Sequence, residues 1–254
     1  MIVLFTDFGL AGPYVGEMKA VLEQRAPDVP VIDLMHDAPS FDAKASAYLF
    51  AALVGSFPAG SIFVCVVDPG VGSDRAPVII EADGRQFVGP DNGLLAILAR
   101  RAETLRAHRI TWRGEHLSAS FHGRDLFGPV AAMLATGEHF ASEEIRPGAI
   151  DRPDWPDELA EIIYFDSFGN AMTGIRAVTL PADAALQAAG KNFSRARTFS
   201  DVAPGDAFWY ENSSGLAEIA INCGRADGLG LVRGAPIAIS VTRSETIRNR
   251  QCQP

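Results

Sequence analysis

Along the first half of the chain, short runs of β-branched and apolar residues alternate with stretches whose apolar residues recur at helical spacing. Runs of the first kind are typical of buried strands, and stretches of the second kind are typical of helices that cover a sheet. The alternation therefore predicts a layered α/β domain. The expected strands are residues 2–5, 31–34, 61–67, 77–81 and 86–89, and the expected helices are residues 13–26, 43–53 and 94–99.

The pattern changes beyond the middle of the chain. Residues 147–156 contain several prolines and a glycine, which is typical of a linker. Short strands separated by turns follow, and this pattern indicates a small β-rich domain. We therefore expect an N-terminal α/β domain over residues 1–150 and a C-terminal β-barrel-like domain over residues 157–254. The expected strands of the second domain are residues 159–165, 208–211, 216–221 and 237–241.

Charge and cysteine content narrow the classes of partner. The chain of 254 residues has a formal net charge of -9 and a pI near 5.0, and its basic residues are scattered among acids, so we expect no nucleic-acid partner. Cys65, Cys223 and Cys252 are widely spaced and odd in number, which argues against a disulfide framework or a zinc site. We expect a cytoplasmic protein without a membrane partner, because no targeting or membrane-spanning apolar run occurs.

Common nucleotide-binding motifs are absent. The chain has neither a G-x-G-x-x-G sequence after a strand nor a G-x-x-x-x-G-K-[ST] sequence, so neither a dinucleotide fold nor a P-loop is predicted. The triplet Asp7-Phe8-Gly9 matches one kinase motif by chance, because the other kinase motifs are missing.

Two acids follow predicted strands directly. Asp7 ends the first strand just before a helix. A carboxylate there can accept hydrogen bonds from two ribose hydroxyls or, about equally well, from the free backbone N–H groups at the start of the helix. Asp68 ends a later strand, and the glycine-rich turn after it can bring Arg75 to the same space. Asp68 and Arg75 are as compatible with a structural ion pair as with a functional site. His122 lies beside a glycine, whereas the other histidines are expected to be structural: His36, His108, His116 and His139.

Taken together, these segments resemble the S-adenosylmethionine hydroxide adenosyltransferases, or hydrolases, which are related to the fluorinases and chlorinases. The likeness runs from residue 6 to residue 222. The resemblance implies that Asp68, Arg75 and His122 hold an attacking water, and that the substrate S-adenosyl-L-methionine is cleaved to adenosine and methionine. It rests on the stretches TDFG, PYVGEMK, VVDPGVGSDR, VGPDNGLL, FHGRDLFGP, DSFGNAMTGI and NSSGLAEIAIN.

The resemblance also implies the substrate contacts. It assigns Asp7 to the ribose hydroxyls and Phe41 to an aromatic wall. In the C-terminal part, Asp166 and Asn170 match groups that hold the methionine ammonium and the adenine edge, and Phe168 can stack on the base. The full set of substrate-binding residues implied in this way is Asp7, Phe8, Phe41, Asp166, Phe168, Asn170, Ser213 (near the methionine carboxylate) and Asn222 (near adenine).

The resemblance implies a homotrimer whose sites lie between subunits, and a reaction without a metal or a cofactor. Two alternatives remain at this stage. A halogenase would share the substrate, but an anionic Asp68 would repel a halide at contact distance. A non-catalytic S-adenosylmethionine- or adenosine-binding protein would have no need of the Asp68, Arg75 and His122 set. The residues alone leave both Asp68 and His122 as the proton acceptor.

Overall fold

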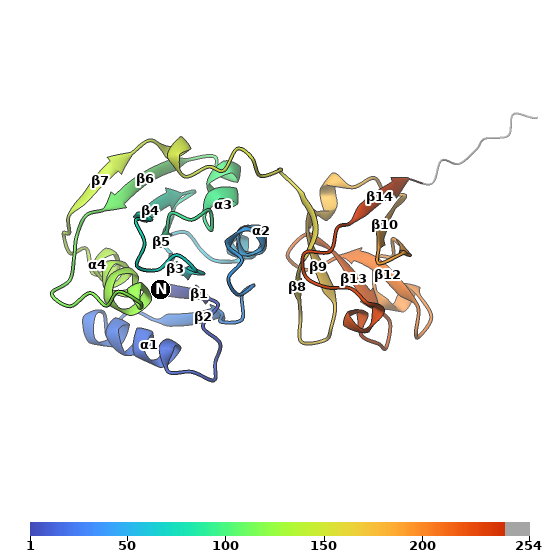
Figure 1. Cartoon of the computed structure of the whole chain (residues 1–254), viewed down its shortest axis with the longest axis horizontal. Helices are drawn as coiled ribbons and strands as arrows, with labels where there is room; N and C mark the ends of the chain where they lie inside the picture. Colours follow the sequence, from blue (N-terminus) through green and yellow to red (C-terminus); the bar gives the residue numbers. More distant parts are fainter. Residues whose placement is uncertain (242–254) are drawn as a thin grey trace, which may run out of the picture. The chain divides into compact units, whose positions relative to one another are not determined.

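The structure of this chain is a computed structural model that describes residues 1–241. It divides into two compact units, Met1–Leu159 and Ala160–Pro254. Each unit has its own sheets (Figure 1) and its own apolar core.

The first unit is built on a seven-stranded sheet in the order β2-β1-β3-β5-β4-β6-β7. Strands β2, β1, β3 and β5 run parallel, whereas β4, β6 and β7 add antiparallel pairs at one side. The strands are β1 (Ile2–Thr6), β2 (Val31–Met35), β3 (Ile62–Val66), β4 (Pro77–Ala82), β5 (Arg85–Pro90), β6 (Leu105–Ile110) and β7 (Ser142–Ile145).

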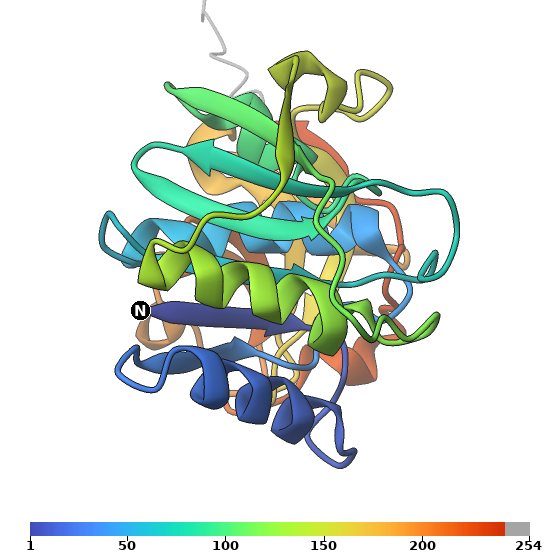
Figure 2. The same cartoon turned by 90° about the vertical axis from the view of Figure 1, so that its left-hand side faces the viewer.

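Helices cover both faces of this sheet. On one face, Met18 and Leu22 of α1 and Val130 of α4 pack on alternate residues of the parallel strands, and Figure 2 shows these two helices lying across the sheet. On the other face, Phe50 of α2 and Leu98 of α3 join the second half of the core. The helices are α1 (Tyr14–Arg25), α2 (Ala43–Leu53), α3 (Ala96–Arg101) and α4 (Gly128–Thr136).

The second unit consists of two antiparallel sheets around one core. The sheets have the orders β12-β13-β9-β8 and β11-β10-β14, and isolated bridges from Arg195 to Trp209 and from Glu161 to Pro236 join their edges. Trp209 is fully buried in this core and donates from Nε1 to the carbonyl of Ala184. The strands are β8 (Leu159–Phe165), β9 (Ala171–Arg176), β10 (Ala184–Ala188), β11 (Lys191–Ser194), β12 (Ala207–Glu211), β13 (Leu216–Ile221) and β14 (Ala238–Val241).

The predicted fold class, an α/β part followed by a smaller β part, is confirmed. The predicted strands at 159–165 and 216–221 coincide with β8 and β13. Several elements carry no clear period and were not predicted. Helix α4 is buried over its first turns on all sides, whereas β7 is a charged, exposed edge strand. Hydrophobic periodicity predicts elements that are buried on one face only, so neither element shows it.

The segment predicted as a linker is packed against the first unit. It contains a short 3-10 helix, Pro147–Ala149, and Ile150 is buried in the core beside β6. Arg100 of α3 bonds the carboxylate of Asp151 and the carbonyl of Trp155. These contacts place residues 147–156 inside Met1–Leu159.

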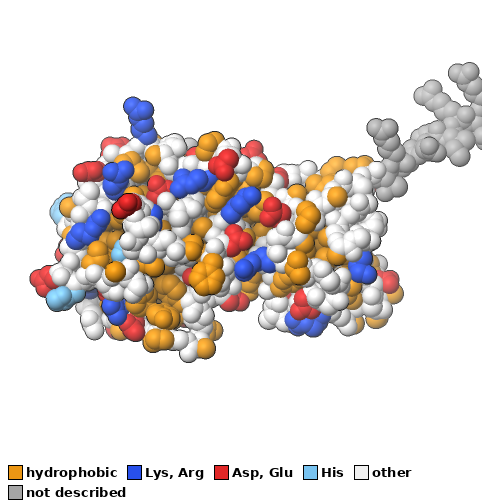
Figure 3. Space-filling model, viewed as in Figure 1, with side chains coloured by type: hydrophobic (Ala, Val, Ile, Leu, Met, Phe, Trp, Pro, Cys, Tyr) orange, Lys and Arg blue, Asp and Glu red, His pale blue; other side chains and the backbone are white. Residues whose placement is uncertain are grey.

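Within residues 1–241, no helix is long and apolar enough to cross a bilayer. Side chains of both charges are intermixed on the face shown in Figure 3. Cys65 is buried and Cys223 is exposed, and both are free thiols. Cys252 lies outside the described residues.

Candidate active site

Strands β1 and β3 lie next to each other and run in parallel, so the residues that follow them meet at one edge of the sheet. Asp7 follows β1, and its backbone N–H donates to the carbonyl of Val66 at the end of β3. Asp68 comes two residues after β3, and Asn92 bonds the carbonyl of Val67 just before it. The two acids therefore lie where open α/β sheets place ligands.

The turn after Asp68 folds back tightly on a neighbouring segment. Gly72 has a φ of +80°, and a Cβ built there would lie 2.6 Å from the carbonyl oxygen of Ala119. Only glycine fits such a close approach of two backbones at a positive φ. This contact brings the turn that carries Asp68 and Arg75 against the segment that carries His122.

Arg75 joins Asp68 and His122 into one hydrogen-bonded cluster. Its Nε lies 3.0 and 2.9 Å from the two carboxylate oxygens of Asp68, and its Nη2 donates to the same carboxylate. Nη2 also lies 2.7 Å from His122 Nδ1. The Arg75 and Asp68 side chains are 8% and 4% exposed, and the guanidinium lies over the Phe127 ring at 5.2 Å. The sequence-predicted ion pair is therefore buried, and Arg75 links it to the partly buried ring of His122.

These bonds fix the state of His122. A guanidinium has donors only, so Nδ1 of His122 must accept the bond from Arg75, and the proton of the neutral ring then lies on Nε2. Burial, and next the positive charge of Arg75, lower the pKa of His122. The ring is thus neutral at neutral pH and presents an Nε2–H donor.

A charged network holds the segment that carries His122. His122 directly precedes a π-helical turn, Gly123–Phe127, which leads into α4, and such turns are frequent at functional sites. Asp125 accepts from the Ser118 N–H at 2.9 Å and from Arg124 Nε at 2.6 Å. Arg124 in turn reaches Glu17 of α1 at 2.5 Å. Glu17, Arg124 and Asp125 lie inside the motifs that carried the resemblance, but none of them was predicted as a site residue.

A pocket in the first unit is lined by most of the residues predicted for its half of the site. Phe41 has a φ of +61°, is 81% exposed, and donates its N–H to Asp7 Oδ2 at 3.3 Å. Burial first, and the charge of Asp68 in addition, raise the pKa of Asp7. The pocket is lined by Asp7, Phe8, Phe41, Val66, Asp68, Pro69, Val71, Ser120, Phe121, His122 and Gly123. Its volume is about 130 Å³, below the roughly 300–1,000 Å³ of pockets that enclose drug-sized ligands.

The second unit has a pocket of its own, with a volume of about 620 Å³. Asp166 and Asn170 lie on the turn from β8 to β9, where Asp166 accepts from the Asn170 N–H at 2.8 Å and from its Nδ2 at 3.0 Å. Phe168 on the same turn is 74% exposed. The pocket is lined by Asp166, Phe168, Asn170, Phe199, Tyr210, Ile221, Cys223, Gly224 and Arg225.

Two predicted residues of this unit do not line that pocket. Ser213 is exposed in the turn between β12 and β13. Asn222 donates from Nδ2 to the Val202 carbonyl at 2.8 Å, while its neighbours Ile221 and Cys223 line the pocket. The side chain of Asn222 therefore bonds a neighbouring loop, and the residues on either side of it line the pocket.

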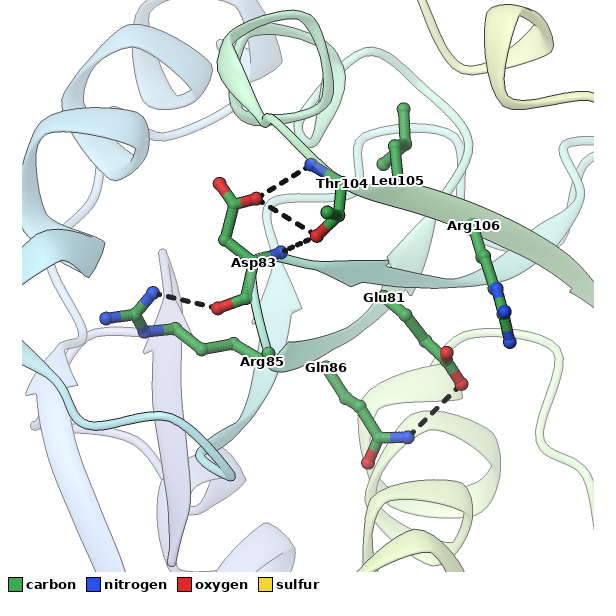
Figure 4. Close-up of a pocket in the computed structure, with 8 residues that line it drawn as sticks. Glu81, Asp83, Arg85, Gln86, Thr104, Leu105 and Arg106 are labelled. Carbon is green, nitrogen blue, oxygen red and sulfur yellow. Dashed lines mark hydrogen bonds between the residues drawn. The ribbon is translucent and has the colours of Figure 1, made fainter.

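A further hollow lies at the opposite edge of the first sheet, where β5 begins (Figure 4). Asp83 accepts hydrogen bonds there from the backbone and the hydroxyl of Thr104, and Gln86 bonds Glu81. None of the sequence-predicted site residues lies in this hollow.

His36 is buried and shares a hydrogen bond of 2.7 Å between Nδ1 and the Thr6 hydroxyl, just before Asp7. Within residues 1–241, no group of three or more His, Cys, Asp or Glu side chains is arranged to hold a metal ion.

A layered α/β unit with a buried Asp-Arg-His cluster beside an aromatic-walled pocket defines a protein that acts on a small organic molecule. The family model of the SAM hydroxide adenosyltransferase N-terminal domain matches residues 2–144, and that of the C-terminal domain matches residues 160–238. The chain belongs to the SAM hydroxide adenosyltransferase family.

Individual relatives agree with this assignment. The (R)-S-adenosyl-L-methionine hydrolase of Salinispora arenicola is 39% identical over 240 residues, which cover 88% of this chain and 91% of that protein. An uncharacterized conserved protein from Thermotoga maritima has a similar crystal structure, with a TM-score of 0.79 and 30% identity over 94% of this chain and 99% of that one. A fluorinase of Nocardia brasiliensis is more distant, at 22% identity over 163 residues, or 54% of each chain.

The buried carboxyl of Asp7 generates a prediction about stability. Because burial raises its pKa, the folded protein disfavours the ionised form. Asp7→Asn keeps an acceptor for the Phe41 N–H and is expected to raise the melting temperature of the ligand-free protein at pH 7 by roughly 1–4 °C.

The folded state binds the Asp7 proton more tightly than the unfolded state, so the gain should shrink as the pH falls toward about 4. Thermal melts followed by circular dichroism measure the difference. The exposed Asp74→Asn serves as the control and should show no comparable shift. A lower melting temperature for Asp7→Asn at pH 7 would contradict the claim that the folded protein disfavours the ionised form of Asp7.

Proposed function

We propose that this chain hydrolyses S-adenosyl-L-methionine to adenosine and L-methionine. The observation that carries the proposal is the buried cluster in which Arg75 bonds both Asp68 and His122. Membership of the family and the likeness to curated hydrolases support the same reaction.

In the proposed reaction, a water oxygen attacks the 5' carbon of the ribose. The carbon–sulfur bond breaks, its electron pair goes to sulfur, and the positively charged sulfonium becomes the neutral thioether of methionine. A thioether leaves without acid assistance, so the protein has to hold and deprotonate the water. Alignment of the water opposite the sulfur can contribute several kcal/mol to catalysis.

In this proposal, the oxygen and the proton of the water contact different residues. His122 has its proton on Nε2 and its Nδ1 bonded to Arg75, so it has no free site for a second proton and acts as a donor to the water oxygen. Asp68 keeps acceptor capacity beyond its bonds with Arg75 and takes the water proton. Arg75 stabilises the developing hydroxide by its charge.

The family resemblance suggests substrate contacts in both units. Asp7 is proposed to bind the ribose hydroxyls, with Phe8 and Phe41 as apolar walls. In the second unit, Asp166 and Asn170 are proposed for the methionine ammonium and the adenine edge, and Phe168 for stacking on the base. Ser213 and the backbone beside Asn222 complete the proposed set, at the methionine carboxylate and the adenine.

A homotrimer with sites between subunits is part of the proposal. The family resemblance suggests it, and three observations support it: the predicted residues fall in two separate units, the first pocket is small for the whole substrate, and Phe41 and Phe168 are largely exposed. Three-fold closure of a head-to-tail contact would build three equivalent sites.

The reaction itself is tested by the origin of the product oxygen. Incubation with S-adenosyl-L-methionine in oxygen-18 water should give adenosine labelled at the 5' hydroxyl, because water is the nucleophile. Mass spectrometry of the purified adenosine measures the label. Unlabelled adenosine would contradict attack by water. A 5'-halogenated nucleoside formed when chloride or fluoride is added would favour the halogenase instead.

The division of roles in the cluster is tested by substitutions. Asp68→Asn should lower kcat by about 10²–10⁴-fold with little change in KM, because it removes the proton acceptor and leaves the substrate contacts.

The role of His122 is tested by a pair of variants. His122→Gln can still place an N–H near the water and should keep at least about tenfold more activity than His122→Ala. Steady-state kinetics gives both values. Equal losses in the two His122 variants would contradict its role as a donor.

Sites between subunits are tested by complementation. Asp68→Asn damages only the first set of residues and Asn170→Ala only the second, so each pure protein should have little activity at low substrate. After subunit exchange, about a quarter of the sites in random trimers would combine two intact sets. Activity should therefore reappear in the mixture. A mixture that stays inactive, with exchange shown by native mass spectrometry, would place each site within one chain.

A further inference from the structure

His36 is a buried histidine for which the proposed reaction has no use. It directly follows the edge strand β2, in which Ile32 and Asp33 are exposed, and yet it is only 5% exposed itself. Its Nδ1 lies 2.7 Å from the Thr6 hydroxyl, and its Nε2 lies 3.1 Å from Asp33 Oδ1 without an aligned hydrogen bond. An apolar side chain would fill this volume without the cost of desolvating two ring nitrogens. The imidazole therefore needs an explanation beyond packing.

The carboxylate of Asp33 indicates which nitrogen of this ring carries the proton. An oxygen that faces Nε2 favours a proton there, because a bare lone pair would be repelled. Nδ1 of the neutral ring then accepts the hydrogen bond from the Thr6 hydroxyl. The Thr6 oxygen keeps its lone pairs for the turn that follows, and the Phe8 N–H donates to it at 3.4 Å. His36 thus fixes the direction of a hydroxyl that supports this turn.

Backbone hydrogen bonds on either side of this contact join the same two segments. The Gly9 N–H donates to the His36 carbonyl at 2.6 Å, and the Ala38 N–H donates to the Thr6 carbonyl at 3.1 Å. Asp7 lies between Thr6 and Gly9 in the sequence. The turn that carries Asp7 is therefore held at both ends by the segment that carries His36.

These two segments supply three residues of the first pocket. Asp7 and Phe8 come from the turn after β1, and Phe41 comes from the loop after β2. Asp7 Oδ2 also accepts the Phe41 N–H at 3.3 Å. A change in the contact between the two segments would therefore move both the Asp7 carboxylate and the residue that bonds it.

We infer that His36 is a positioning residue that acts through the Thr6 hydroxyl to hold the Asp7 carboxylate where it meets the ribose hydroxyls. The inference deepens the proposed function and rests on it, because ribose binding by Asp7 is part of that proposal. A carboxylate accepts from a hydroxyl only within about 2.5–3.0 Å, so a turn that is loose by about 1 Å loses most of this interaction. His36 then contributes to the preference of the site for a nucleoside with both hydroxyls.

The test compares adenosine with 2',3'-dideoxyadenosine, which lacks both hydroxyls. His36→Leu keeps roughly the same volume and removes the acceptor of the Thr6 hydroxyl. The affinity for adenosine should fall at least about fivefold, whereas the affinity for the dideoxy nucleoside should change less than about twofold. Isothermal titration calorimetry gives both dissociation constants. A purely structural role of His36 would weaken the binding of both nucleosides equally.

Three further variants serve as controls. His36→Asn is the conservative change, because its Oδ1 can replace Nδ1 as the acceptor for Thr6, and it should keep most of the preference for adenosine. The exposed His139→Asn is the matched control and should keep the wild-type preference. Asp7→Ala removes the hydroxyl contact itself, so adding His36→Leu to it should cause no further loss of preference.

Kinetics separates this inference from the proposed function. With S-adenosylmethionine, the effect of His36→Leu should lie mainly in KM, with kcat altered less than about threefold. A wild type that prefers adenosine over its dideoxy analogue but releases no adenosine from S-adenosylmethionine would sink the proposed function. The role of His36 in nucleoside binding would still be measured by calorimetry.

A folded His36→Leu with the wild-type preference would overturn the inference and make His36 a structural residue. If that variant does not fold, Thr6→Val and Thr6→Ser answer the same question, because valine keeps the shape without the hydroxyl and serine keeps the hydroxyl. The preference should fall in Thr6→Val and persist in Thr6→Ser. Equal preference in these two variants, or a wild type without any preference for the ribose hydroxyls, would overturn the inference equally.

Discussion

The rest of the first pocket depends on the hydrogen bonds that the Arg75 guanidinium donates to Asp68 and His122. The guanidinium carries only donors, so every group that it bonds must be an acceptor. Asp68 meets this requirement as a carboxylate, and His122 meets it only as a neutral ring with its proton on Nε2. This cation therefore fixes the tautomer of His122, and its charge contributes to lowering the pKa of that ring.

The surrounding backbone holds these three side chains together. The parallel pairing of β1 and β3 brings their ends to one edge, the Gly72 turn lies against Ala119, and a π-helical turn follows His122 directly. Close backbone approaches of this kind allow little adjustment, which suits a site whose groups must stay aligned.

Much of this arrangement can be predicted from the sequence, but unevenly. Strand ends followed by Asp7 and by Asp68 are visible in the apolar pattern, and the Pro-Gly turn already suggests that Arg75 folds back toward Asp68. Nothing local links His122 to them, because the contact joins residues 47 positions apart and depends on the packing of two loops. Only the likeness to a known family placed it in the site.

Burial explains the other residues that the sequence did not disclose. Glu218 stands in an alternating strand where an acid would ordinarily face solvent, and its burial is decided by the neighbouring strands β12 and β9. The network of Glu17, Arg124 and Asp125 likewise spans elements that are distant in sequence. Local periodicity cannot report a contact of this kind, since it describes one element at a time.

The same cluster determines which nucleophile suits the proposed reaction. A halide is an acceptor without a proton, so the His122 Nε2–H and the charge of Arg75 would favour it, but the Asp68 carboxylate lining the pocket would repel it. Water differs because it accepts from His122 with its oxygen and donates a proton to Asp68. A site with a donor on one side and an anionic acceptor on the other therefore fits a nucleophile that has a proton to give, and this distinction follows from the side chains themselves rather than from the family to which the chain belongs.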